Sequence, residues 1–122
     1  MIDKEIYEQV HQWMEAHKEN MIHDIQRIVR IPSISKPEEE IKPFGAACRQ
    51  AMDEMLQIVR RDINHPCIFT WVLFNESWGV TRIRQNLKQQ RLTLSAYYAV
   101  KAIDPGRFVI SNDGWEHTKS DL

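Results

Sequence analysis

The feature that most constrains the fold is an apolar run, Cys67 to Phe74, that ends abruptly in Asn75 and Glu76. The run is rich in β-branched and aromatic residues and is preceded by Pro66, a pattern typical of a strand covered on both faces in a parallel sheet. Parallel α/β folds place their active sites at the carboxyl ends of such strands. The run therefore predicts a core strand that delivers the Glu76 carboxylate to a site.

A helix and a second strand follow. Apolar residues at helical spacing predict a helix from about Thr93 to Ile103, which Asp104-Pro105-Gly106 would stop, and Arg107 to Asn112 reads as a short strand. Strand, helix and strand in this order form a right-handed parallel βαβ unit. Parallel pairing would bring the polar end of the first strand next to the polar segment Asn112 to His117.

The first half of the chain is helical. Helical spacing predicts helices over residues 4–17, 21–30 and 44–59, with a loop over 33–43, because Pro32 disfavours helix at Ile31. We therefore expect an α/β fold of three N-terminal helices followed by a βαβ unit. A closed eight-stranded barrel needs about 250 residues, so the 122 residues here cannot close one.

Composition narrows the classes of partner. The chain is 43% hydrophobic and 27% charged with a formal net charge of -1, which gives no reason to expect nucleic acid. It has no apolar run near the ~20 residues of a membrane helix and no signal-peptide pattern at its start, so we expect a cytoplasmic protein that does not bind membranes. The spacing of its cysteines and histidines predicts no metal site, and we expect no cofactor.

Four motifs in the second half carry a family resemblance. They are Arg61-Asp62-x-Asn64-His65-Pro66, Trp71-Val72-Leu73-Phe74-Asn75-Glu76, Tyr98-x-x-Val100-Lys101-x-Ile103-Asp104-Pro105 and Asn112-Asp113-Gly114-Trp115-Glu116-His117. With these motifs, residues 59–122 resemble the catalytic barrel of glycoside hydrolase family 2, which includes β-galactosidases and β-glucuronidases. The resemblance implies that the βαβ unit is a fragment of a TIM (β/α)8 barrel.

The same resemblance implies roles for residues. Glu76 matches the acid/base carboxylate and Asn75 the neighbouring amide that contacts the sugar, so the implied partner is a carbohydrate substrate. A retaining mechanism needs a second carboxylate about 5 Å away as nucleophile. In the family that residue lies on a later strand, and the sequence stops at Leu122. We therefore expect a truncated site that is inactive alone.

Other polar and aromatic residues are candidates for the sugar pocket. Trp78 and Trp115 could stack on a sugar or belong to the core. Asp113 and Glu116 are pocket candidates, although the family pattern makes neither the nucleophile. His117 could line the pocket or cap a turn.

The first half carries a different resemblance. Met21-Ile22-x-Asp24-Ile25, Val29-Arg30-Ile31-Pro32-Ser33-Ile34-Ser35 and Pro43-Phe44-Gly45 make residues 1–56 similar to the N-terminus of dinuclear metallopeptidases such as acetylornithine deacetylase and related dipeptidases. The family's His-x-Asp metal motif is absent from this sequence. We therefore predict a chimera of two fragments, 1–58 and 59–122, that share no core. The alternatives are a metallopeptidase-type hydrolase fragment and a non-enzymatic module that self-associates through exposed apolar surface.

Overall fold

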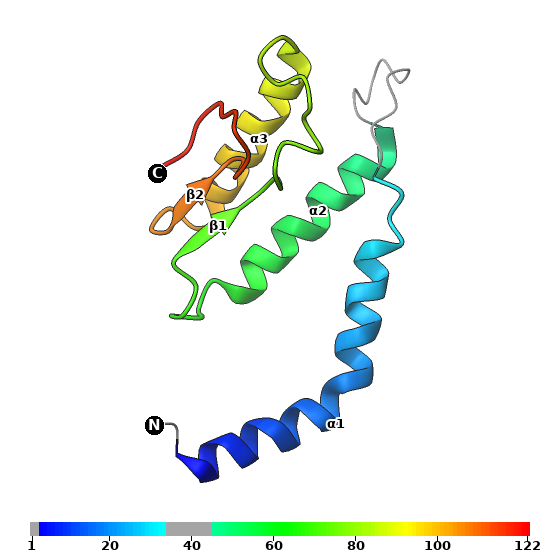
Figure 1. The fold of residues 1–122 in the computed structure, drawn as a ribbon, viewed down its shortest axis with the longest axis vertical. Helices are drawn as coiled ribbons and strands as arrows, with labels where there is room; N and C mark the ends of the chain where they lie inside the picture. The colour runs from blue at the N-terminus through cyan, green and yellow to red at the C-terminus, as the bar shows by residue number, and fades with distance from the viewer. Residues whose placement is uncertain (1–2, 34–44) are drawn as a thin grey trace. The chain divides into compact units, whose positions relative to one another are not determined.

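The computed structural model describes residues 3–33 and 45–122. Along the chain these residues form α1 (Lys4–Val29), α2 (Gly45–Asp62), β1 (Thr70–Val72), α3 (Leu87–Ile103) and β2 (Phe108–Ile110), shown in Figure 1. The chain divides into two compact units, Met1–Pro32 and Ser33–Leu122. The predicted α/β class and the open sheet are confirmed.

The first unit consists of α1. The prediction of separate helices over residues 4–17 and 21–30 is wrong, because the connecting Lys18, Glu19 and Asn20 contain no glycine or proline and the helix continues through them. Asp3 caps its start by accepting a hydrogen bond from the Glu5 backbone N–H at 3.0 Å. The helix ends at Val29, as Pro32 predicted. Apart from Ser33, the loop predicted over 33–43 lies outside the described residues, as does Phe44.

The second unit has its core between two helices and the sheet. Val59 of α2, Tyr97 and Val100 of α3 and Val109 of β2 form the buried cluster, with partly buried apolar side chains packed around it: Met55, Leu56, Trp71, Leu73 and Ile103. Residues before and after position 58 therefore share this core, and the expectation that they would not is wrong. The physical reason is that α2 runs unbroken through the predicted boundary and places Met55 and Leu56 on the same face as Val59.

The two strands pair in parallel, with Thr70 opposite Phe108, Trp71 opposite Val109 and Val72 opposite Ile110. Since α3 connects them, the predicted βαβ unit is confirmed. The strands are shorter than predicted. The prediction of a strand covered on both faces is also wrong: Trp71 lies on the covered side, whereas Val72 and Phe108 are about half exposed.

Helix α3 begins at Leu87, earlier than the predicted Thr93, because Asn86 acts as its N-cap. The Asn86 side-chain oxygen accepts hydrogen bonds from the backbone N–H groups of Lys88, at 2.9 Å, and Gln89, at 3.3 Å. The helix ends before Asp104, as the Asp-Pro-Gly sequence predicted. None of the helices within the described ranges is long and apolar enough to cross a membrane.

Candidate functional site

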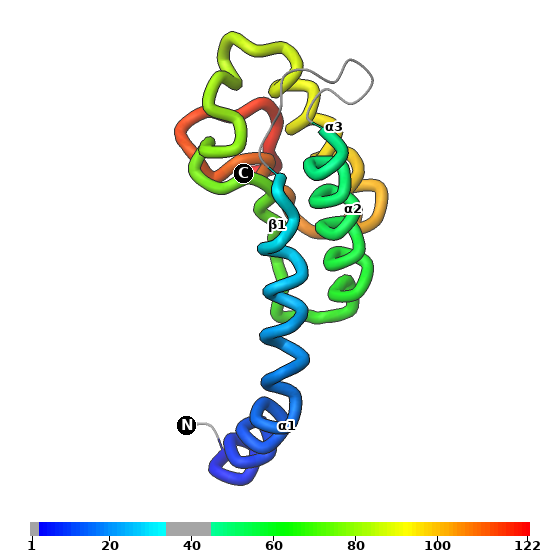
Figure 2. Tube along the Cα trace, turned by 90° about the vertical axis from the view of Figure 1, so that its right-hand side faces the viewer, coloured from blue at the N-terminus to red at the C-terminus, as the bar shows by residue number. Residues whose placement is uncertain are grey.

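The carboxyl ends of β1 and β2 lie side by side. Backbone hydrogen bonds continue past the strands, from Leu73 N–H to the Ile110 carbonyl and from Asp113 N–H to the Phe74 carbonyl, each at 3.1 Å. Figure 2 shows the segments that follow the two strands at the same end of the second unit. We call residues 75–77 and 112–114 the strand-end cluster. Its formation confirms that parallel pairing brings the two polar segments together.

The backbone of the cluster is unusual at two consecutive residues. Glu76 has φ +48° and Ser77 has φ +62°, in the left-handed region that residues other than glycine rarely adopt. Such conformations cost on the order of 1–3 kcal/mol each and persist where surrounding contacts enforce them. The contacts here come from the other strand end.

Two side chains from the β2 end bind these two backbone amides. The Glu76 N–H donates to Asp113 Oδ1 at 2.6 Å, and the Ser77 N–H donates to Asn112 Oδ1 at 3.0 Å. Asn112 also donates through Nδ2 to Ser77 Oγ and to the Glu116 carbonyl, both at 2.7 Å. Asn112 is fully buried and Ser77 is 4% exposed, so water cannot easily replace these bonds.

Gly114 completes the cluster by allowing close approach. A Cβ atom at this position would lie 2.2 Å from Ser77 Oγ and 2.6 Å from Ser77 N. Only glycine fits against the Glu76–Ser77 backbone here. Sequence reasoning did not single out Ser77, Asn112 or Gly114 as site residues, although Asn112 and Gly114 stood in a quoted motif.

The predicted acid and amide lie at the surface. Asn75 and Glu76 are exposed, and Glu76 Oε2 accepts a hydrogen bond from the Trp78 indole N–H at 3.2 Å. The Trp78 ring is 71% exposed, which excludes the alternative of a core residue within the described chain. Trp78 also lines a cavity of about 580 Å³, mostly apolar, between α2, the β1 end and α3.

Three predicted pocket residues lie elsewhere. Trp115, Glu116 and His117 line a second cavity of about 520 Å³ together with Arg84. Glu116 Oε1 forms an ion pair with Arg84 Nε at 2.8 Å, and Trp115 is 72% exposed. The predicted site residues thus divide into the strand-end cluster, Trp78 in the first cavity and the three residues of this second cavity.

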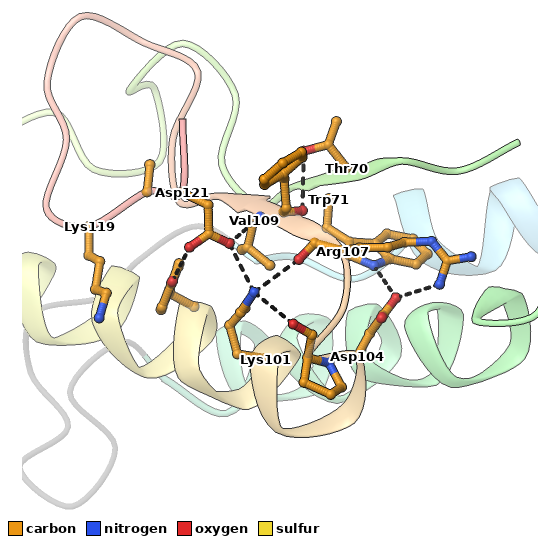
Figure 3. A network of polar contacts seen from close by, with 12 residues as sticks. Thr70, Trp71, Lys101, Asp104, Arg107, Val109, Lys119 and Asp121 are labelled. Atoms are coloured by element: carbon orange, nitrogen blue, oxygen red, sulfur yellow. Dashed lines mark hydrogen bonds and ion pairs between the residues drawn. The ribbon is translucent and has the colours of Figure 1, made fainter. Parts of the chain in front are cut away.

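A polar network at the opposite ends of the strands holds the unit together (Figure 3). Asp104 accepts hydrogen bonds from the Trp71 indole at 3.0 Å and from Arg107 at 2.8 Å. Burial would raise the pKa of Asp104, but these donors and the Arg107 charge bring its pKa below the usual value. Arg107 also donates to the carbonyls of Ile68 at 2.6 Å and His65 at 2.8 Å. Arg107 therefore fixes the backbone of the segment that precedes β1.

Asp121 forms the second part of the network, beside β2 and α3. It accepts hydrogen bonds from the Tyr97 hydroxyl, from Lys101 Nζ at 3.0 Å and from the Val109 N–H at 2.9 Å. The Tyr97 hydrogen bond, followed by that from Lys101, lowers the pKa of Asp121 to about 2. The same contact with Asp121 raises the pKa of Tyr97.

Among residues 3–33 and 45–122, no group of three His, Cys, Asp or Glu side chains is placed so that it could hold a metal ion. Arg61 and Asp62, the first two residues of a quoted family motif, form an ion pair at 2.7 Å. The Arg61 hydrogen bond lowers the pKa of Asp62. The pair lies at the C-terminal end of α2 and is not part of the strand-end cluster.

A parallel βαβ unit with polar residues gathered at the carboxyl ends of its strands defines a chain of the α/β class, an arrangement shared by α/β barrels and open α/β sheets. The family model for glycosyl hydrolases family 2, TIM barrel domain, matches residues 14–121. The chain therefore belongs to this family. No curated protein and no solved structure matches it. The family match begins well before residue 59, and the comparisons give no support to the metallopeptidase resemblance or to a chimera.

Proposed function

We propose that this chain carries the acid/base part of a retaining glycoside hydrolase site, with Glu76 as the acid/base carboxylate and Asn75 as a sugar contact. The observation that carries the proposal is the place of both residues, three and four positions after the carboxyl end of the parallel strand β1, in a chain of family 2. The substrate class is a β-galactoside or β-glucuronide. Trp78, exposed beside Glu76, is the aromatic surface for the sugar ring.

The chemistry follows from the groups present. As an acid, Glu76 would protonate the departing glycosidic oxygen, and as a base its carboxylate would accept a proton from water. The Trp78 indole N–H donates a hydrogen bond to Glu76 Oε2. Within the described residues, Glu76 Oε1 accepts no hydrogen bond and is open to a ligand. Asn75 can both donate to and accept from a sugar hydroxyl.

We expect the described residues to supply no nucleophile for this site. Of the two other carboxylates predicted near Glu76, Asp113 accepts the Glu76 N–H and Glu116 pairs with Arg84. A glycosidase acid also works in a dehydrated pocket, whereas Glu76 is exposed. We therefore expect the chain alone to bind sugar weakly and to show no turnover.

Sugar binding tests this function independently of turnover. Titration of ¹⁵N-labelled protein with methyl β-galactoside and methyl β-glucuronide should shift the amide signals of Asn75 and Glu76. Asn75→Ala should weaken binding, while Asn20→Ala, on exposed α1, should leave it unchanged. Failure of both sugars to shift these signals would contradict the proposal.

Turnover is a separate readout. Hydrolysis of an aryl β-galactoside that is lost in Glu76→Gln and kept in Glu19→Gln would support the acid/base role but contradict the expected inactivity. Glu19 is a matched control because it is an exposed glutamate on α1.

A chimeric origin, with residues 1–58 from a metallopeptidase, is a separate proposal that rests on the N-terminal motifs alone. The sequence of the source locus tests it: one long gene containing a complete domain of either family would contradict it. Stoichiometric zinc retained after dialysis would favour a metallopeptidase-type function.

A further inference from the structure

We propose that Asn112 and Asp113 act as positioning residues that hold the Glu76 backbone in its left-handed conformation and so aim the Glu76 side chain. This inference rests on the proposed role of Glu76 as the acid/base. It assigns Asp113 a different role from the substrate contact that the sequence predicted. We call the pair of contacts the amide clamp: Asp113 Oδ1 to the Glu76 N–H and Asn112 Oδ1 to the Ser77 N–H.

The clamp is a tertiary feature and not a local turn. Its hydrogen bonds join residues 37 and 35 positions apart in the sequence. Asx turns bond the backbone within a few residues of the side chain. The Glu76–Ser77 conformation is therefore imposed from the β2 end.

Burial makes the clamp specific. Asn112 is fully buried and uses both its oxygen and its nitrogen within the cluster. Gly114 leaves room for the Ser77 backbone that the clamp holds. Three consecutive residues after β2 thus contact the two left-handed residues after β1.

The consequence for Glu76 follows from backbone geometry. The direction of the Cα–Cβ bond relative to the flanking backbone depends on φ and ψ. Holding the N–H groups of Glu76 and Ser77 therefore restricts the direction in which the Glu76 side chain leaves the backbone. Catalytic groups must be held close to their productive geometry by contacts of this kind. Asp113 supplies that contact by accepting the Glu76 N–H, and this role requires no contact between Asp113 and the substrate.

Amide hydrogen exchange tests the clamp without activity. Asp113→Ala removes the acceptor and should make the Glu76 amide exchange about tenfold faster, while Asp113→Asn keeps an oxygen acceptor and should restore protection. The Val100 amide, in the core helix, reports on global stability and should not change. Equal Glu76 exchange in the wild type and Asp113→Ala would overturn the proposal. Asp113 is exposed, so these variants leave the core intact.

Sugar titration tests the positioning role. Asp113→Ala should weaken the sugar-induced shift at Glu76 and Asp113→Asn should restore it, whereas Asp24→Ala on α1 controls for loss of one negative charge. Equal sugar affinity in Asp113→Ala and the wild type would overturn the positioning role. If the wild type binds neither sugar, the proposed function and the positioning role both fail, and the exchange result still decides whether the backbone clamp exists.

Discussion

At the scale of single residues, the candidate site depends on side chains that the sequence marks only weakly. Asp113 and Glu116 were predicted as pocket residues, yet Asp113 accepts the Glu76 N–H and Glu116 pairs with Arg84. Asn112, which no prediction singled out, binds Ser77. The position of Asn75 and Glu76 could be predicted because an apolar run that ends in polar residues is a local pattern. The contacts of Asn112 could not be predicted, because they depend on which backbone atoms at the end of β1 lie next to Asn112 in the folded chain.

Gly114 gives a prediction at this scale. Gly114→Ala should lower the free energy of unfolding by about 1–3 kcal/mol, because overpacking forces nearby atoms to move and the new Cβ would lie 2.2 Å from Ser77 Oγ. Urea denaturation followed by circular dichroism measures the change. Gly106→Ala is the matched control, since its Cβ would have nothing within 4 Å. Equal stability of the two variants would contradict the close approach.

At the scale of elements, types were predicted better than boundaries. The helix–strand alternation and the stop at Asp104 follow from local sequence. The continuity of α1 was not predicted, because the apolar pattern changes near Lys18 and this change suggested a break between two helices. The residues there are ordinary helix formers, so the helix continues through them. The early start of α3 had a readable signal, the N-cap residue Asn86, which the apolar spacing alone missed.

Asp121 links β2 to α3 and makes their packing sensitive to acid. Its pKa is lowered from 3.8 to about 2 in the folded chain, so its stabilising contribution is present above about pH 4 and is lost as the pH falls through about 2. The melting temperature should therefore fall across this window. The Asp121→Asn variant should have a lower melting temperature than the wild type at pH 7, and its melting temperature should fall less on acidification. Part of the fall should remain, because the pKa values of Asp104 and Asp62 are also lowered in the folded chain.

Thermal melts at several pH values measure this dependence. Asp24→Asn, on α1, is the control for loss of one charge. An identical pH profile for Asp121→Asn and the wild type would show that this carboxylate does not couple β2 to α3.

At the scale of the whole molecule, neither unit covers all its apolar surface by itself. A lone helix buries nothing within its own unit, and α1 carries many exposed apolar side chains: Ile6, Tyr7, Val10, Trp13, Met14, Met21, Ile22, Ile25, Ile28 and Val29. In the second unit the sheet exposes Val72 and Phe108 on its uncovered face. Such surface favours association.

We predict that two copies associate through α1 in antiparallel orientation. The first half of α1 with its cap is acidic, through Asp3, Glu5, Glu8 and Glu15 against Lys4. The second half with its cap has a small positive excess, through Lys18, Arg27 and Arg30 against Glu19 and Asp24. Antiparallel pairing places opposite charges together while burying the apolar side chains. The sedimentation coefficient should therefore rise with protein concentration.

A charge placed in the apolar face tests the prediction. Ile25→Glu should shift the protein toward the monomer, while Gln26→Glu adds the same charge one residue away, outside this apolar set, and should not. Concentration-independent monomers of the wild type would contradict association.

The parallel pairing of β1 with β2 also sets the order in which the second unit folds. Thr70 contacts Phe108 across 38 residues, so the strands cannot meet until that loop has closed, whereas α3 can form from local contacts. The contact between Glu76 and Asp113 spans a similar length and needs the strands already aligned. We predict that the strand-end cluster forms after the folding nucleus, so that a ligand bound there would slow unfolding while leaving the rate of folding unchanged.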